Sequence, residues 1–286
     1  MLTYAAWLAT GSRLAVNVAG RRVEVFVRTA GPANARHVTL LHGFPTSSWD
    51  YHAVAPTLEE RFQTLSFDFI GFGDSDKPRD FPYSIHAQAD LVEVLWKHCG
   101  ITQTSVVTHD YGVSVAQELL ARTLDVKLHG VTFLNGGLYP DLHRALPIQK
   151  LLRHPLLGPV VSRLVNRRAF NKSLRAVFAI PPSATDLDAH WDAVTRRRGH
   201  RLYHRLIHYM GDRQRHAVRW SRALEQSTIP VSFIWGMLDP VSGAHVAARL
   251  AERLPNAPRI QLGDVGHYPQ LEAPDRVLAA LFPLLA

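Results

Sequence analysis

Cysteine is nearly absent from this chain of 286 residues, in which Cys99 stands alone. An intrachain disulfide is therefore impossible, and we expect Cys99 to be a buried thiol near the end of a helix. No run approaches the ~18 consecutive apolar residues of a membrane-spanning helix. Met1–Thr10 lacks the basic start and the sustained apolar stretch of a signal peptide, so we expect a soluble, cytoplasmic protein. Internal repeats and low-complexity tracts are missing as well, so a repeat array is not expected.

The overall composition is that of a globular protein, with 47% hydrophobic and 20% charged residues. The net charge of +8 is unevenly distributed, because residues 138–224 hold 17 lysines and arginines against 5 aspartates and glutamates. Such a surface attracts anionic substrates or an anionic membrane, although a solvated helical surface is the simpler interpretation. Because no nucleic-acid-binding motif accompanies the charge, we do not expect a nucleic-acid partner.

Short apolar segments alternate with helical periodicity along most of the chain. Strands that alternate with helices imply a mostly parallel, eight-stranded sheet with helices on both faces. Ligands of such sheets bind at the carboxyl ends of the strands. The expected strands are 14–18, 22–28, 37–41, 62–68, 105–108, 131–134, 229–235 and 259–262, and the expected helices are 48–60, 84–99, 113–120, 244–254 and one from about 274.

Residues 138–224 interrupt this alternation. Their helical periodicity is broken by prolines, and they lie between two predicted strands. We therefore expect a basic helical cap over the carboxyl ends of the sheet. The α/β core would then consist of residues 1–137 and 225–286, one core of about 200 residues with one inserted segment.

The turn after the strand 105–108 contains Asp110 and leaves almost no room before the next helix. A sharp strand-to-helix turn strains its middle residue and presents that side chain at the carboxyl end of the sheet. Asp110 is thus a candidate nucleophile, although an aspartate there can also be an ordinary N-cap. Two later residues favour the nucleophile. Asp239 and His267 each follow a predicted strand, and the order nucleophile, acid, histidine is that of α/β-hydrolases.

Five motifs at the predicted strand ends support this interpretation. They are His42-Gly43-Phe44-Pro45-Thr46-Ser47-Ser48, His109-Asp110-Tyr111-Gly112, Asn135-Gly136-Gly137, Leu238-Asp239-Pro240 and His267-Tyr268-Pro269-Gln270-Leu271-Glu272. With them the chain resembles the α/β-hydrolase superfamily, in its branch with aspartate nucleophiles, the epoxide hydrolases and haloalkane dehalogenases. It is most similar to mesoderm-specific-transcript-like hydrolases. The resemblance implies a triad of Asp110, Asp239 and His267, and we expect neither a cofactor nor a metal.

A carboxylate nucleophile limits the reaction. With an ordinary pKa of ~3.9, an aspartate is ionised at neutral pH without help from a base. It suits displacement of an epoxide oxygen or a halide at saturated carbon, whereas attack on a carboxylic ester would form an anhydride. The resemblance implies an alkyl ester on Asp110, hydrolysed by a water that His267 deprotonates while Asp239 orients the imidazole. The backbone N–H groups of Phe44 and Tyr111 would hold the oxyanion.

Other polar residues near these positions have weaker claims to catalysis. Ser114 fits a serine elbow, but the strand would then have to continue through the turn that holds Asp110. Asp68 ends an earlier strand and is expected to order the glycine-rich loop that follows it. His42 and His109 are expected to pack and hydrogen-bond within their loops.

The residues that would serve the leaving group match neither relative well. Dehalogenases of this branch usually hold the halide with a tryptophan after the nucleophile and often with an asparagine after the His-Gly pair. Here those positions are Tyr111 and Phe44, which offer no indole or amide donor. Epoxide hydrolases commonly have His-Gly-Phe-Pro, as here, and use cap tyrosines as proton donors. Their late-cap motif Trp-Tyr-Arg reads Trp220-Ser221-Arg222 in this chain.

Four aromatic residues remain candidates for substrate binding or proton donation, namely Tyr139, Tyr203, Tyr209 and Trp49. Tyr203 and Tyr209 are six residues apart and are not expected to share a helix face. We expect an epoxide hydrolase that acts on a small apolar substrate. Dehalogenation and binding without turnover are the alternatives. The sequence does not decide between a monomer and a homodimer. It also leaves open whether the basic cap contacts a membrane.

Overall fold

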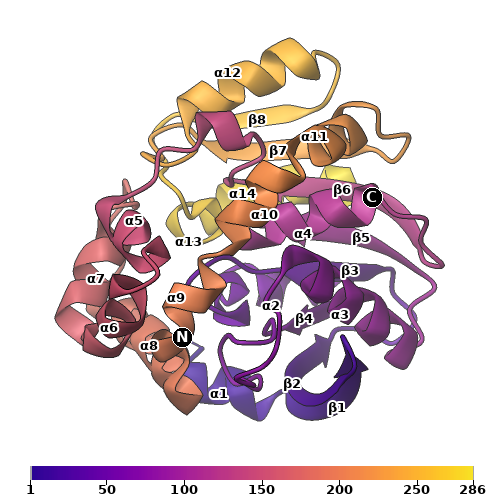
Figure 1. Cartoon of the computed structure of the whole chain (residues 1–286). Coiled ribbons are helices and arrows are strands. Elements are labelled where there is room, and N and C mark those ends of the chain that lie inside the picture. The colour runs from indigo at the N-terminus through magenta and orange to yellow at the C-terminus, as the bar shows by residue number, and fades with distance from the viewer. Residues whose placement is uncertain (1, 286) are drawn as a thin grey trace.

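The structure is a computed structural model that describes residues 2–285. Its centre is an eight-stranded sheet in the order β1-β2-β4-β3-β5-β6-β7-β8 (Figure 1). β2 pairs antiparallel with β1 and β4, and all other neighbours are parallel. The predicted fold class is confirmed. The strands are β1 (Ser12–Val18), β2 (Arg21–Ala30), β3 (His37–Leu41), β4 (Gln63–Phe67), β5 (Gln103–Thr108), β6 (Lys127–Leu134), β7 (Val231–Gly236) and β8 (Arg259–Leu262).

Successive residues of the central strands point into two separate apolar cores, as the period of two in a strand requires. Val106 of β5 packs in the larger core, and its neighbour Val107 packs in the smaller one on the opposite face. Both faces are therefore covered, which leaves the ends of the strands for function. The core helices are α1 (Tyr4–Ala9), α2 (Ala55–Leu58), α3 (Ile85–His98), α4 (Tyr111–Leu120), α12 (Ala244–Arg253), α13 (Pro269–Glu272) and α14 (Pro274–Leu285).

Two details of the core differ from expectation. The single helix expected over 48–60 is wrong, because the chain forms a 3-10 turn at Ser48–Tyr51 and then the one-turn helix α2. Buried Asp50 accepts hydrogen bonds from the Gly43 N–H (3.1 Å) and the Thr46 hydroxyl (2.6 Å), which fixes this turn to the loop after β3. Cys99 does end α3, but it is half-buried rather than buried.

The chain between β6 and β7 is helical, and we call residues 138–224 the inserted helices. In Figure 1, α5 to α8 form a lobe beside the sheet, and α9 to α11 lead back across it. Within residues 2–285 we find no helix both long and apolar enough to cross a bilayer. The inserted helices are α5 (Pro147–Arg153), α6 (Leu157–Leu164), α7 (Arg167–Arg175), α8 (Ala184–Thr195), α9 (Tyr203–Leu206), α10 (Tyr209–Arg215) and α11 (Ala217–Glu225), with 3-10 turns at Pro140–Leu142 and Arg196–Leu202.

Candidate active site

Asp110 occupies the strained turn between β5 and α4. Its backbone has φ 45° and ψ −102°. This left-handed conformation is unfavourable for every residue except glycine. Two glycines make room for this turn. A Cβ atom on Gly112 would lie 2.5 Å from the Leu41 carbonyl oxygen, and one on Gly136 would lie 3.1 Å from the Asp110 Cα. The backbone is thus strained at the residue whose carboxylate the turn presents.

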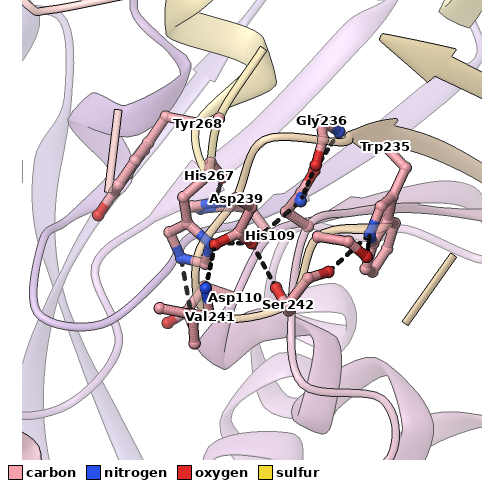
Figure 2. Close-up of polar contacts among 12 residues, drawn as sticks. His109, Asp110, Trp235, Gly236, Asp239, Val241, Ser242, His267 and Tyr268 are labelled. Atoms are coloured by element: carbon pink, nitrogen blue, oxygen red, sulfur yellow. Dashed lines mark hydrogen bonds and ion pairs between the residues drawn. The ribbon is translucent and has the colours of Figure 1, made fainter. Parts of the chain in front are cut away.

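The three residues predicted as a triad lie together, although they follow three different strands (Figure 2). His267 Nε2 lies 3.4 Å from Asp110 Oδ2, and His267 Nδ1 donates to Asp239 Oδ2 at 2.7 Å. Asp239 also accepts hydrogen bonds from the Val241 N–H (2.7 Å) and the Ser242 hydroxyl (2.5 Å). The acid therefore holds the imidazole in one orientation, with its other nitrogen toward Asp110.

Asn135 at the end of β6 connects the elbow to the acid. Its carbonyl accepts from the Asp110 N–H at 2.9 Å, and its side-chain amide donates to Asp239 Oδ2 at 3.0 Å. The amide group also exchanges two hydrogen bonds with the Gly236 backbone. The sequence shows Asn135 at a strand end, but only the packed sheet reveals that its side chain bridges two neighbouring strands.

The charges of the three residues stabilise one another. Burial by itself would raise the pKa of Asp110, but the hydrogen bond and charge of His267 outweigh it, and the pKa lies below its ordinary value. The pKa of Asp239 lies well below its ordinary value for the same reason. Burial opposes protonation of His267, yet the two carboxylates raise its pKa to about 10. At neutral pH the site therefore holds an imidazolium between two carboxylates.

Two backbone N–H groups border the Asp110 carboxylate. The Phe44 N–H donates to Asp110 Oδ1 at 2.8 Å. The Tyr111 N–H belongs to the first turn of α4 and has no acceptor within residues 2–285. One predicted donor therefore contacts the carboxylate, and the other is free beside it.

A cavity of about 110 Å³ opens onto Asp110 and His267. Its other walls are mainly apolar side chains of the inserted helices, and Tyr203 contributes a buried hydroxyl that lacks a hydrogen-bond partner within residues 2–285. Water is poorly held by such a lining, whereas an apolar molecule fits it. The apolar lining includes Leu146, Ile148, Leu152, Val165, Phe170 and Leu174.

Of the four aromatic candidates, Tyr203 lines the cavity, and Tyr209 packs against Phe44, which lines it. The rings of Tyr203 and Tyr209 lie 5.5 Å and 5.8 Å from the ring of Phe44. They begin two separate helices, α9 and α10, so the expectation that six residues would put them on different faces of one helix does not apply.

The other two candidates, Tyr139 and Trp49, do not line the cavity, so a role for them in substrate binding stays a prediction. Tyr139 is buried, with its hydroxyl near Glu225 and its ring under Arg249. Trp49 is buried, and its ring stacks on that of His52 with the ring centroids 3.9 Å apart. Tyr139 packs in the larger core, and Trp49 packs in a small cluster with Tyr4 and Trp7.

Ser114, Asp68 and His42, the other polar residues near the predicted site, occupy positions that suit a structural role. Ser114 is buried inside α4, a turn beyond the elbow. Asp68 accepts hydrogen bonds from the Ser48 and Asp74 N–H groups, in agreement with its expected loop role. His42 Nε2 accepts from the Phe69 N–H at 3.0 Å.

His109 lies against the triad without joining it. Its Nε2 donates to the His267 carbonyl oxygen at 2.8 Å, which ties the elbow loop to the loop that carries His267. His109 therefore helps to fix the relative position of the two loops, as its expected packing role implies.

The sequence is similar to known hydrolases along most of its length. A family model described as alpha/beta hydrolase fold matches residues 36–274. The chain belongs to this family. LipZ of Mycobacterium tuberculosis, named as a hydrolase, is 42% identical over 268 residues, which cover 92% of each chain. The human mesoderm-specific transcript homolog protein is 40% identical over 250 residues, 83% of this chain and 75% of the relative.

The more distant relatives include haloalkane dehalogenases. Haloalkane dehalogenase 2 of Mycobacterium tuberculosis is 28% identical over 253 residues, 85% of this chain and 86% of the relative. The structure of a loop variant of haloalkane dehalogenase DbeA from Bradyrhizobium elkanii has a TM-score of 0.80. It is 24% identical and covers 96% of this chain and 97% of its own, which supports the shared fold.

Proposed function

We propose that this hydrolase opens an epoxide, or a closely related electrophile, through an ester on Asp110. The observation that carries the proposal is the Asp110 carboxylate itself. It stands at positive φ on the floor of an apolar cavity, with Oδ2 directed toward His267 and Oδ1 held by the Phe44 N–H. Structural carboxylates rarely occupy such strained positions, whereas nucleophiles on sharp elbows do.

In the first step Asp110 Oδ2 attacks a saturated carbon of the substrate. A new C–O bond forms, the epoxide C–O bond breaks, and its electron pair goes to the epoxide oxygen, which takes a proton from an acid of the inserted helices. Because the pKa of Asp110 is low, the nucleophile is ionised at neutral pH. Tyr203 and Tyr209, which flank Phe44, are the candidate acids.

In the second step a water attacks Cγ of the Asp110 ester and gives a proton to His267. Alkylation has removed the negative charge of Asp110, one of the two charges that raise the pKa of His267. The pKa of the imidazole therefore falls after alkylation, and the imidazolium releases its proton to solvent before the neutral ring accepts one from the attacking water. The Phe44 and Tyr111 N–H groups stabilise the oxyanion on Oδ1, and the alcohol leaves with Oδ2 as it takes the proton from His267.

Dehalogenation is the second candidate, because one relative is named a haloalkane dehalogenase. The nucleophilic half of the site suits either substrate. The positions beside it favour the epoxide, since Phe44 and Tyr111 present aromatic rings and a phenol where an amide or an indole would bind a halide.

Mass spectrometry of the intact protein tests the proposal. The variant His267→Gln is incubated with an aryl epoxide or a 1-bromoalkane, because loss of the base should let the ester accumulate. An epoxide adds its whole mass, and a bromoalkane adds an alkyl group and releases bromide. In the same His267→Gln background, Asp110→Ala should form neither adduct, and Ser114→Ala, a matched buried control in α4, should form both. The absence of any adduct across a broad panel of both compounds would contradict the proposal.

A further inference from the structure

Helix α6 turns its large apolar side chains toward solvent. Leu157, Val160 and Leu164 follow the i, i+3, i+7 spacing of one helix face. All three are exposed, Leu164 to 71%, and Leu156 at the N-cap of the helix is exposed to 77%. Single exposed apolar residues are ordinary, but four of them on one helix and its cap form a patch that a partner would cover. We call these four residues the α6 face.

The opposite side of α6 carries small residues that are buried, Gly158 and Ser162. A Cβ atom on Gly158 would lie 2.2 Å from the Leu152 carbonyl oxygen, so the two backbones are in close contact there. The Ser162 hydroxyl accepts a hydrogen bond from the His204 N–H at 2.9 Å. An ordinary surface helix buries its apolar face and exposes its polar one. In α6 this polarity is reversed, which indicates that the α6 face has a function outside the fold.

The chain around α6 is exclusively basic. Residues 142–185 contain eight lysines and arginines and no aspartate or glutamate. Within residues 2–285, only Arg167 among these eight has a carboxylate within 4.0 Å, that of Asp188. The positive charge of the segment is therefore largely unneutralised by the protein itself. Its exposed members include Lys150, Arg163, Arg168, Lys172 and Arg175.

The helices next to the α6 face also form walls of the apolar cavity. On α5, Leu151 is exposed, whereas its neighbour Leu152 is buried and lines the cavity. On α7, Phe170 lines the cavity, while Arg168 is exposed. These helices belong to the lobe beside the sheet (Figure 1). The lobe therefore has an inner side toward the cavity and an outer side that is both apolar and basic.

The chemistry of the outer side favours one kind of partner. A second copy of the chain would bring two basic surfaces together, and like charges repel. A nucleic acid would neutralise the charge but would offer no apolar contact to the leucines of the α6 face. A bilayer that contains anionic lipids supplies both an apolar boundary for the leucines and negative headgroups for the basic side chains.

We propose that the α6 face docks on the surface of a bilayer that contains anionic lipids. The leucines and the valine enter the boundary between headgroups and acyl chains, and the basic residues of α5, α6 and α7 contact the headgroups. The protein then lies on the membrane, with the lobe that borders its cavity against the lipid. The proposal goes beyond the function proposed above and does not depend on the ester on Asp110.

Sedimentation of the full chain with lipid vesicles tests the apolar part of the proposal. The protein should bind vesicles of phosphatidylcholine and phosphatidylglycerol and should bind phosphatidylcholine alone weakly. Val160→Gln should weaken binding about fivefold, because one apolar side chain no longer leaves water. Val218→Gln is the matched control, because Val218 is a valine of α11 that is 84% exposed and lies apart from α6 (Figure 1). It should bind within about twofold of the wild type.

A second matched pair tests the charge. Arg163 of α6 and Arg222 of α11 are both exposed and have no ion pair within residues 2–285. Arg163→Gln should weaken binding about fivefold, as loss of one basic residue near an anionic surface does, and Arg222→Gln should have little effect. High salt should weaken binding of the wild type and reduce the difference between the two variants.

The triple variant Leu157→Gln, Val160→Gln, Leu164→Gln should lose binding by more than about 50-fold. Circular dichroism checks its fold, and if it does not fold, the Val160 and Val218 variants decide. Wild-type protein that does not bind the anionic vesicles would overturn the proposal. Equal binding to phosphatidylcholine alone would overturn it too, and so would a folded triple variant that binds like the wild type.

Two other results would assign the α6 face to a protein and overturn the membrane proposal. One is a dimer in analytical ultracentrifugation that the triple variant dissociates, without vesicle binding by the wild type. The other is binding to polyglutamate, lost in the triple variant, again without vesicle binding. Neither result bears on catalysis, since alkylation of Asp110 is measured without lipid.

Discussion

The two halves of the site differ in how completely their polar atoms are paired. In the half built from strand ends, both carboxylate oxygens of Asp239 accept hydrogen bonds, and His267 contacts two carboxylates. In the half built from the inserted helices, buried donors of Tyr203, His143 and Arg213 have no partner within residues 2–285. The nucleophilic half is preorganised before substrate arrives, whereas the other half is completed only by what binds there.

The difference suggests a division of labour. In the proposed mechanism the strand ends fix how the bond is attacked, because hydrogen bonds and ion pairs hold Asp110, Asp239 and His267 in place. We propose that the inserted helices determine which bond is attacked, because their unpaired donors are available to a bound substrate. Variants of the two halves should therefore affect different steps of the reaction.

Asp239→Asn should have the largest effect on the second step. An amide cannot balance the charge of an imidazolium or fix its tautomer, so ester hydrolysis should slow by about 10³–10⁴-fold. Formation of the ester should change far less, because Asp110 attacks without a base. Rapid-quench mass spectrometry follows both steps, and an equal loss in both would refute the division of labour.

Tyr203→Phe should slow ester formation about tenfold, since a positioned acid near the leaving oxygen contributes to this step. Tyr139→Phe is its matched control, because Tyr139 is a buried tyrosine of the same segment outside the cavity. Single-turnover rates with an aryl epoxide compare the two. If both variants slow ester formation equally, the loss of rate comes from altered packing rather than from a lost proton donor.

The paired half should also make stability depend on pH. The pKa of His267 is raised to about 10, above an unfolded value of ~6.5. The native state therefore holds a proton that the unfolded state loses, and stability should fall as pH rises from 7 to 10. We expect a fall of at least about 1 kcal/mol in the free energy of unfolding, measured with urea. In His267→Gln the fall should be smaller, and an identical pH profile would exclude His267 as its source.

Backbone strain at the elbow predicts the smallest effect. Asp110→Gly and Asp110→Ala both remove the carboxylate, but only glycine adopts φ 45° without strain. Asp110→Gly should be more stable than Asp110→Ala by about 1 kcal/mol in urea unfolding. Equal stabilities would mean that the turn relaxes when the charge is removed.

Much of the fold follows from local patterns in the sequence. Alternating segments predict the parallel sheet, and β8 begins and ends at the predicted residues. The proximity of Asp110, Asp239 and His267 can also be predicted, because each follows a strand and parallel strands bring their ends together. The bridging role of Asn135 cannot, since the direction of its side chain depends on how β6 and β7 pair.

The inserted helices are less predictable for a physical reason. Their helix faces are set by contacts with distant loops, so periodicity cannot distinguish Tyr203, on the cavity, from Tyr139, outside it. Arg213 looks in the sequence like any of its basic neighbours, and only burial distinguishes it. The domain boundaries at 137 and 224 stay a prediction, as does any membrane contact of the basic surface.

A single turnover in water labelled with heavy oxygen tests the central claim, the ester on Asp110, most directly. Enzyme in excess over an epoxide should yield a first diol without label, because its new oxygen comes from Asp110 Oδ2. The peptide that contains Asp110 should gain one labelled oxygen from the hydrolytic water. A labelled diol in the first turnover, with Asp110 unlabelled, would mean that water attacks the epoxide directly and that no ester forms.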